Sequence, residues 1–334
     1  MTARTVKLRE TDSLFVGKPS AVWLAGHGAF FVADLQNARV FQVDSAGTIA
    51  RVLGRPGPGP GELELPLQLV GLGDSALGVA DETKKAIEIF TLSTGAFQRA
   101  RPYEGLIMSV AVDGPTVWMG GVSPRHARGV KRWDLSTDSM TYLVPLPLPY
   151  QRSPPLASFF NTVAVAPRGN RLIVGYGADR AILVVDRDGM AVDSFAVPFA
   201  RRRGEPADLE RRVDPKNDME LADMAALTSV LRQVGVRGDG SLVFVHMDFG
   251  FVPPRTVTAK AFVSLVSADL TRACVDAALP QEDPSDVPIE FRGDTLFTVQ
   301  QHVGGGQRAE TSLVGYLIDS SRCDWVPVSH GRLH

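Results

Sequence analysis

Side chains that could hold a metal ion are few, and they are scattered along the chain. A calcium site needs hard oxygen ligands, and the apolar segments of the sequence offer Asn161 and Glu290 for this role. Asp34, Asp81 and Asp248 carry further carboxylates. Each of these three ends an apolar segment at a turn, where a turn-forming residue is expected without any ligand. We therefore expect no cofactor, with a calcium ion in the centre of the fold as the alternative.

The residues that could perform nucleophilic or phosphate chemistry also lack the spacing that such chemistry needs. The 6 histidines show no H-E-x-x-H motif or other paired spacing, so a zinc site is not indicated. Gly304, Gly305 and Gly306 are not followed by Lys-Ser or Lys-Thr, as a phosphate-binding loop would require. No G-x-S-x-G motif is present. An enzyme is therefore the less favoured prediction, although a catalytic set that converges from distant segments stays open.

The composition describes a folded chain of mixed charge. The 334 residues include 35 Lys and Arg against 37 Asp and Glu, and 44% are hydrophobic, which is enough for a large core and excludes general disorder. A balance this close to neutral argues against nucleic acid as the partner. No run of 18 apolar residues occurs, so we expect no transmembrane helix. The start, MTARTVKLRE, lacks an apolar signal region and predicts a cytoplasmic protein, with a periplasmic or extracytoplasmic one as the alternative if this numbering begins at a processed end.

A repeat of about fifty residues organises the chain. Residues 28–54 and 75–101 share a short apolar segment ending in Val-Ala-Asp, a polar turn, an alternating segment, a Ser/Thr-Gly turn and a third segment. The two aspartates, Asp34 and Asp81, are 47 residues apart. Looser copies follow to the end of the chain. Each unit has four segments of period-2 alternation between turns, which predicts four short strands.

Four-stranded units at this spacing are typical of a β-propeller, in which a ring of sheets covers both faces of each sheet. We predict an all-β, six-bladed β-propeller of four-stranded antiparallel blades in a single domain, 1–334. The N-terminal Thr5–Leu8 also alternates and could pair with the last blade. The predicted blades are 19–54, 66–101, 106–146, 160–197, 229–279 and 287–328, with a helical insertion at 198–228.

The connection after the first repeat carries a family resemblance. The segment from Leu53 to Leu63, LGRPGPGPGEL, resembles the G-x-x-G-x-G-P-G-E-F connection of bacterial six-bladed propellers related to NHL repeats, within the TolB-like propeller superfamily. The resemblance covers the first two repeats and fades to blade periodicity after residue 110. It implies the propeller fold. It implies little about activity, because such propellers serve as binding modules, scaffolds and occasionally enzymes.

Long connections gather on one predicted face of the propeller. The turns on the other face are tight hairpins. Long loops are often functional, so this loop face is the predicted interaction surface. Its segments are 54–66, 122–129, 144–159, 198–228, 249–258, 280–286 and 302–310. Segment 144–159 is rich in proline, which predicts an extended chain that loses little entropy on binding.

Basic and aromatic residues on this face are the candidate partner-binding set. Arginine suits bidentate contact with carboxylates and is enriched in interface cores. A protein with an acidic or mixed surface is therefore the expected partner. The predicted residues are Arg125, His126, Arg128, Tyr150, Arg152, Phe159, Arg201, Arg202, Arg203, Arg211, Arg212, Arg255 and Arg308.

Two cysteines complete the inventory. Cys274 and Cys323 fall near the start of the predicted outermost strand in consecutive blades. Equivalent positions on neighbouring blades should lie beyond the roughly 7 Å Cα separation that a disulfide tolerates. We therefore expect two free thiols.

These observations favour a non-catalytic interaction or scaffold module. It would be an accessory subunit docked through its loop face on a larger assembly, with peripheral contact to a membrane complex as one setting. A metal-dependent hydrolase or lactonase that uses the central channel is the alternative. A sensor of a small anionic ligand is a second alternative.

Overall fold

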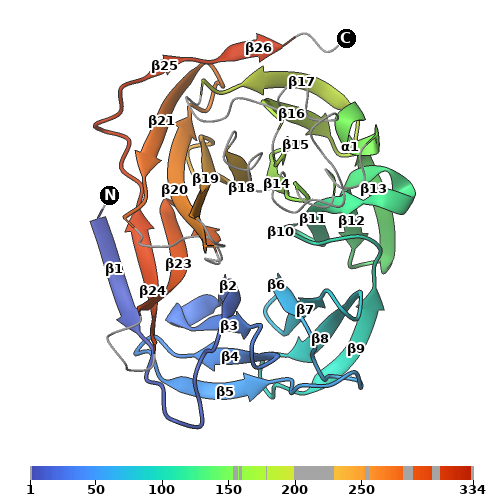
Figure 1. Cartoon of the computed structure of the whole chain (residues 1–334). Coiled ribbons are helices and arrows are strands. Elements are labelled where there is room, and N and C mark those ends of the chain that lie inside the picture. Colours follow the sequence, from blue (N-terminus) through green and yellow to red (C-terminus); the bar gives the residue numbers. More distant parts are fainter. Residues whose placement is uncertain are drawn as a thin grey trace. The chain divides into compact units, whose positions relative to one another are not determined.

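A computed structural model describes residues 2–152, 157, 160–177, 179–198, 229–252, 256–280, 289–302 and 309–331. The chain divides into two compact units. Unit 1 comprises Met1–Glu104 and Asp286–Asp319, and unit 2 comprises Gly105–Ser285 and Ser320–His334. The described residues form six antiparallel sheets, three in each unit (Figure 1). No helix in this part of the chain has the length and hydropathy needed to cross a membrane.

Unit 1 holds three four-stranded sheets. The first contains β2 (Pro19–Leu24), β3 (Phe30–Asp34), β4 (Arg39–Val43) and β5 (Ile49–Leu53). The second contains β6 (Pro66–Leu72), β7 (Ala76–Asp81), β8 (Ala86–Thr91) and β9 (Phe97–Pro102). The third contains β22 (Ile289–Arg292), β23 (Thr295–His302), β24 (Glu310–Leu317) and β1 (Thr2–Lys7). A short 3₁₀ turn, η1 (Gly26–Gly28), joins β2 to β3.

Unit 2 holds the other three sheets. The first contains β10 (Ser109–Asp113), β11 (Thr116–Ser123), β12 (Arg128–Asp134) and β13 (Ser139–Pro145). The second contains β14 (Val163–Arg168), β15 (Arg171–Tyr176), β16 (Ala181–Asp186), β17 (Ala191–Ala196) and the late strand β26 (Ser329–Gly331). The third contains β18 (Val230–Val236), β19 (Leu242–Val252), β20 (Thr256–Val266), β21 (Arg272–Ala278) and the late strand β25 (Val326–Pro327). Two short helical turns, η2 (Pro124–His126) and α1 (Leu148–Arg152), lie between strands.

The second strand of a sheet is buried on both faces, which explains its nearly continuous apolar sequence. Every residue of β3 and of β7 is buried. On one face of the first sheet Phe31 packs with Leu69 and Val79 of the second sheet, while on the other face Phe30 packs with Val299 of the third. A sheet between two neighbours therefore buries apolar side chains in both directions, as the repeat predicts.

The N-terminal strand completes the last sheet, as the alternation at Thr5–Leu8 predicted. β1 pairs antiparallel with β24, with Thr5 opposite Val314 and Lys7 opposite Ser312. Figure 1 shows β1 in blue beside β24 in red. This sheet of unit 1 thus combines a strand from the start of the sequence with three strands from residues 289–317.

The outer strand of this last sheet differs from the prediction. The predicted sixth blade, 287–328, was to supply its own fourth strand, but β1 takes that place. The chain after β24 instead continues into two sheets of unit 2, where β25 pairs with β21 and β26 pairs with β17. Cys323 therefore lies beside β21, and it forms a disulfide with Cys274 with a Cα–Cα distance of 5.5 Å. The prediction of two free thiols is wrong because it placed Cys323 in the wrong sheet.

Two predicted loop segments contain regular secondary structure. Residues 249–252 and 256–258 belong to the 11-residue strands β19 and β20, so most of the predicted loop 249–258 is a paired β-ribbon. The predicted extended segment 144–159 begins as strand but turns helical at α1, where Gln151 N–H donates to Pro147 O at 3.2 Å. The helical insertion at 198–228 is not confirmed, because residues 199–228 lie outside the described part of the chain.

Candidate functional site

A closed turn between β11 and β12 carries the best-defined predicted residues. The η2 turn ends at Ala127, which has φ 50° and donates its N–H to Pro124 O at 3.1 Å. Ser123 pairs with Arg128 at the base of the turn, so the turn cannot open without breaking a strand pair. Arg125 and His126 lie at its exposed tip. The imidazole of His126 stacks on Tyr142 with a centroid distance of 3.8 Å and an interplanar angle of 18°.

One hydrogen bond joins segment 144–152 to this turn, a second joins it to β15, and a third closes the segment on itself. Leu146 N–H donates to Ala127 O at 3.1 Å. The Tyr176 hydroxyl donates to Pro145 O at 2.8 Å, and Gln151 Nε2 donates to Leu146 O at 2.6 Å. Burial raises the pKa of Tyr176 well above its ordinary value, so its hydroxyl stays a neutral donor at any physiological pH. The turn and the segment therefore form one fixed platform.

An aromatic cluster lies beneath the platform and removes Tyr150 from the predicted contact set. Tyr150 is only 2% exposed and packs against Tyr176 with a centroid distance of 5.6 Å. Phe160 belongs to the same cluster, and Phe249 of β19 packs against it. Tyr150 thus supports the platform from inside, and its surface role in the prediction is wrong. Tyr150 and Phe160 are thus residues of a buried core.

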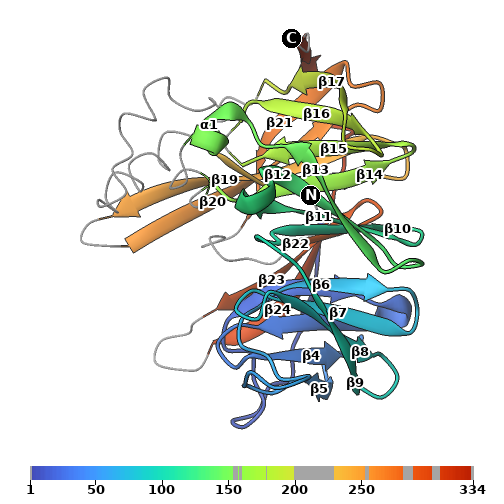
Figure 2. The same cartoon turned by 90° about the vertical axis from the view of Figure 1, so that its right-hand side faces the viewer.

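The β19–β20 ribbon extends from the same side of unit 2. β18 pairs with β19 only from Leu242 to Met247, whereas β19 and β20 stay paired out to Val252 and Thr256. Figure 2 shows the two strands projecting past the other strands of unit 2 on the side that carries α1. Contact of Phe249 with the aromatic cluster ties the base of this ribbon to the platform.

The remaining predicted residues fall into three groups. Arg128 is half-buried, and its Nη1 donates to Ala127 O at 3.1 Å, so it stiffens the turn as well as charging it. Arg152 ends α1, but its side chain is outside the described atoms. The others lie outside the described residues: Phe159, Arg201, Arg202, Arg203, Arg211, Arg212, Arg255 and Arg308.

Sequence reasoning missed two residues that shape the platform, Tyr142 and Gly129, and one exposed arginine, Arg180, on the equivalent turn of the neighbouring sheet. Arg180 is exposed in the turn between β15 and β16, the connection equivalent to the β11–β12 turn, and that equivalence could have revealed it. Tyr142 supports His126 from β13. Gly129 gives Tyr176 its space, since a Cβ there would lie 2.5 Å from the Tyr176 oxygen. Only the fold brings Tyr142 and Tyr176 to this turn.

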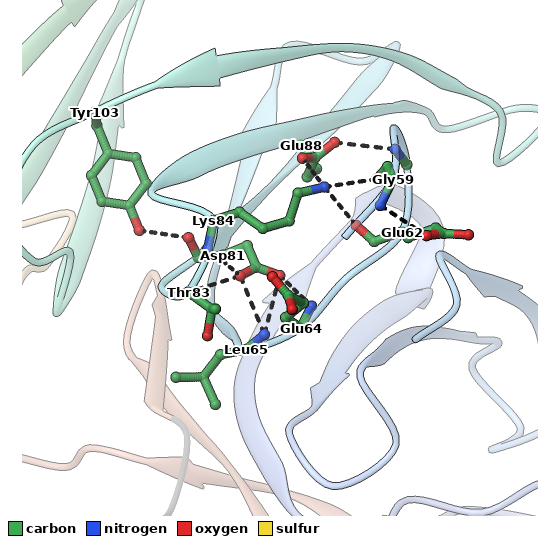
Figure 3. A network of polar contacts seen from close by, with 10 residues as sticks. Gly59, Glu62, Glu64, Leu65, Asp81, Thr83, Lys84, Glu88 and Tyr103 are labelled. Atoms are coloured by element: carbon green, nitrogen blue, oxygen red, sulfur yellow. Dashed lines mark hydrogen bonds and ion pairs between the residues drawn. The ribbon is translucent and has the colours of Figure 1, made fainter. Parts of the chain in front are cut away.

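The long connection 54–66 in unit 1 proves to be a structural loop. Gly57 N–H donates to Leu63 O at 3.0 Å, and Gly59 N–H donates to Glu62 Oε2 at 2.8 Å, which helps to lower the pKa of that carboxyl. Lys84 Nζ donates to Gly59 O at 2.9 Å and to Glu62 O at 3.0 Å (Figure 3). The loop is thus closed by contacts with its own sheet. We assign its glycine-rich sequence to this closure.

A buried ion pair stands at the centre of that network. Lys84 Nζ lies 2.5 Å from Glu88 Oε1, and the two side chains are 12% and 2% exposed. Glu88 Oε2 also accepts the Gly61 N–H at 3.3 Å. Figure 3 shows Lys84 reaching between Glu88 and the loop carbonyls. The pair therefore fastens the loop to β8.

The Val-Ala-Asp repeat has a similar structural cause. Asp81 accepts the N–H groups of Glu64 at 2.7 Å and Thr83 at 3.1 Å, which joins the incoming connection to the next turn. Asp34 does the same in the first sheet with Gly17 at 2.9 Å and Gln36 at 3.1 Å. The recurring aspartate is thus a buried anchor for backbone donors, as its turn position suggested.

The predicted calcium ligands belong to different units of the chain. Asn161 precedes β14 in unit 2, and Glu290 lies on β22 in unit 1. Burial raises the pKa of Glu290 to about 8, so this carboxyl is largely protonated at neutral pH. Among the described residues, no group of three or more His, Cys, Asp or Glu side chains could hold a metal ion. A cofactor stays an untested part of the prediction.

Comparison with known proteins identifies the fold. No protein-family model matches the sequence, and no curated protein matches it. A member of the DUF4221 family from Bacteroides vulgatus matches with a TM-score of 0.65 and 9% identity, over 98% of this chain and 97% of that one. An exported-protein candidate from Bacteroides fragilis matches with a TM-score of 0.63 and 11% identity, over 95% of both chains.

An enzyme of the same fold is also similar. Virginiamycin B lyase from Staphylococcus aureus matches with a TM-score of 0.53 and 10% identity, over 94% of this chain and 99% of that one. With the six sheets, these matches show that the chain has the six-bladed β-propeller fold, as the repeat and the resemblance predicted. At such low identity they show the fold alone.

Proposed function

We propose that this chain is a non-catalytic interaction module that binds a protein partner through the platform of unit 2. The observation that carries the proposal is the closed β11–β12 turn, which holds Arg125 and His126 exposed on a fixed backbone. A surface that is ordered before binding loses less entropy when the complex forms. The stacking of His126 on Tyr142 and the fastening by Tyr176 supply that order.

The charge of the platform indicates the chemistry of the partner. Arg125 and Arg180 are exposed on equivalent turns of neighbouring sheets, and the half-buried Arg128 adds a third guanidinium. Arginine forms bidentate hydrogen bonds with carboxylates and is enriched at protein interfaces. An acidic or mixed protein surface is therefore the partner that fits. The projecting β19–β20 ribbon enlarges the surface that such a partner could contact.

The disulfide supports a setting outside the cytoplasm. Disulfides persist in oxidising compartments and are rare in the cytosol of most organisms. The similar Bacteroides fragilis protein is itself described as a candidate for export. We therefore favour the periplasmic or extracytoplasmic alternative over the cytoplasmic one. In that setting the module would serve as an accessory subunit, docked on a larger assembly that includes a membrane complex.

Charge reversal on the platform tests the proposal. The double variant R125E/R180E changes two exposed guanidiniums, one on the closed β11–β12 turn and one on the equivalent β15–β16 turn. We expect the amount of native partner that co-purifies with this variant to fall roughly tenfold or more, because the introduced glutamates repel an acidic partner surface. Arg4→Glu is the matched control, since Arg4 is exposed on the outer strand β1. Equal recovery by R125E/R180E and the unchanged protein would refute the proposal.

A further inference from the structure

The end of the chain forms a strap across two sheets of unit 2. We call residues 320–331 the C-terminal strap. Its first strand, β25, places Val326 opposite Ala273 and Pro327 opposite Arg272 on β21. Its second strand, β26, places Ser329, His330 and Gly331 opposite Ala196, Phe195 and Ser194 on β17. The strap therefore adds a fifth strand to each of two neighbouring sheets and covers both outer edges.

One covalent bond fixes the strap near its beginning. Cys323 is bonded to Cys274 of β21, and the two cysteines are 49 positions apart in sequence. Both cysteines are half-buried. The bond closes a loop of the chain that contains β22, β23 and β24.

Besides its two strand pairs, the strap contacts the rest of unit 2 through Val328, which packs in a buried core cluster, and through Trp325 and His330. Val328 is its one described residue that is buried, and its N–H donates to Thr271 O at 2.9 Å. The guanidinium of Arg272 lies 5.5 Å from the Trp325 ring centre. His330 Nε2 lies 3.1 Å from Leu270 O, and its Nδ1 is 3.8 Å from Asp193 at an exposed position.

Apart from Val328, these contacts involve exposed or half-buried side chains of the strap. An exposed charged contact of this kind contributes little to stability. The strand pairs of β25 and β26 span only five positions on the two sheets. The disulfide shortens the tether between the strap and β21 and so raises the effective concentration at which the other contacts form.

We propose that the C-terminal strap is a redox-released cover of the outer edges of β17 and β21. A dithiol reductant opens it: a thiolate attacks one sulfur of the disulfide, the S–S bond breaks, and one cysteine leaves as a thiolate that takes up a proton. The second thiol of the reductant then displaces the other cysteine, so two cysteine thiols form and the reductant becomes a cyclic disulfide. The freed strap leaves β17 and β21, and their outer N–H and C=O groups face solvent.

Hydrogen exchange with mass spectrometry tests this on the full chain. It compares the oxidised protein, the protein treated with excess dithiothreitol, and the double variant C274S/C323S. We expect the amides of the strap, that of Val328 included, to exchange roughly tenfold or more faster in the second and third samples. Peptides covering β7 in unit 1 serve as the internal control and should exchange at the same rate in all three.

Each other outcome contradicts the proposal. Equal exchange of the strap in oxidised and reduced protein would show that the non-covalent contacts hold it alone. Faster exchange in C274S/C323S but not in dithiothreitol-treated protein whose mass shows two added hydrogens would show that the substitutions, not the lost bond, loosen it. A disulfide that survives excess dithiothreitol in the native protein would show that the strap is not redox-released.

Discussion

Replacing Lys84 by methionine tests the buried ion pair of unit 1. The K84M variant leaves Glu88 as a charge with a side chain 2% exposed and its cation removed. It also removes two hydrogen bonds, to Gly59 O at 2.9 Å and to Glu62 O at 3.0 Å. Breaking a buried pair by deleting one partner costs about 3–5 kcal/mol, because the remaining charge stays desolvated. We expect a loss of that size in the free energy of unfolding.

The adjacent lysine provides a matched control for K84M. Lys85 pairs with Glu82, but its side chain is 45% exposed, so K85M should cost about 0–1 kcal/mol. The double variant K84M/E88L should recover part of the loss, because no unpaired charge stays buried, while the hydrogen bonds of Lys84 and the one that Glu88 accepts from Gly61 stay lost. Urea unfolding followed by tryptophan fluorescence measures all three. A cost for K84M no greater than that for K85M would refute the reasoning.

Three further variants probe the anchors, the platform and the buried acid. Asp81→Ala leaves the N–H groups of Glu64, Leu65 and Thr83 without their acceptor and should cost about 2–3 kcal/mol in urea unfolding. Tyr176→Phe removes the hydroxyl bonded to Pro145 O and should cost about 1 kcal/mol and speed hydrogen exchange over 144–152; unchanged exchange would contradict the fastened platform. Burial raises the pKa of Glu290 to about 8, so between about pH 4.5 and pH 8 the folded state binds more protons than the unfolded state and stability falls as pH rises. Glu290→Gln should lose that part of the fall when unfolding is compared at pH 5 and pH 8, and an unaltered pH slope would contradict the shift.

The sequence predicts the fold because its repeats record local physical requirements. Val-Ala-Asp recurs since the second strand is buried on both faces and the aspartate then anchors backbone donors at its end, as Asp34 and Asp81 do. The alternation of Thr5–Leu8 likewise predicts a strand, and β1 confirms it. Such signals are readable because each depends on a few neighbouring residues.

The errors arise where a distant segment decides the outcome. Once β1 fills the outer place in the last sheet, the chain after β24 is free to reach β21, and Cys323 meets Cys274. No residue near Cys323 in sequence indicates that β1 takes the outer place in the last sheet and that the chain after β24 pairs with β21. The long connection 144–159 predicts an exposed position for Tyr150, but Tyr150 packs in the buried cluster that contains Tyr176 and Phe160. Of the platform, the sequence gives the basic residues at its tip, while its support from Tyr142 and Tyr176 requires the fold.

The most direct measurement of the proposed function is site-specific photocrosslinking in the native organism. A photoreactive p-benzoylphenylalanine at position 125, in place of Arg125, tests the platform, and the same group in place of Arg4 tests the outer strand of unit 1. We predict an adduct at position 125 whose partner, identified by mass spectrometry, is joined through an acidic segment, and no adduct at position 4. Adducts at position 4 with none at position 125 would contradict the assignment of the platform as the partner-binding surface.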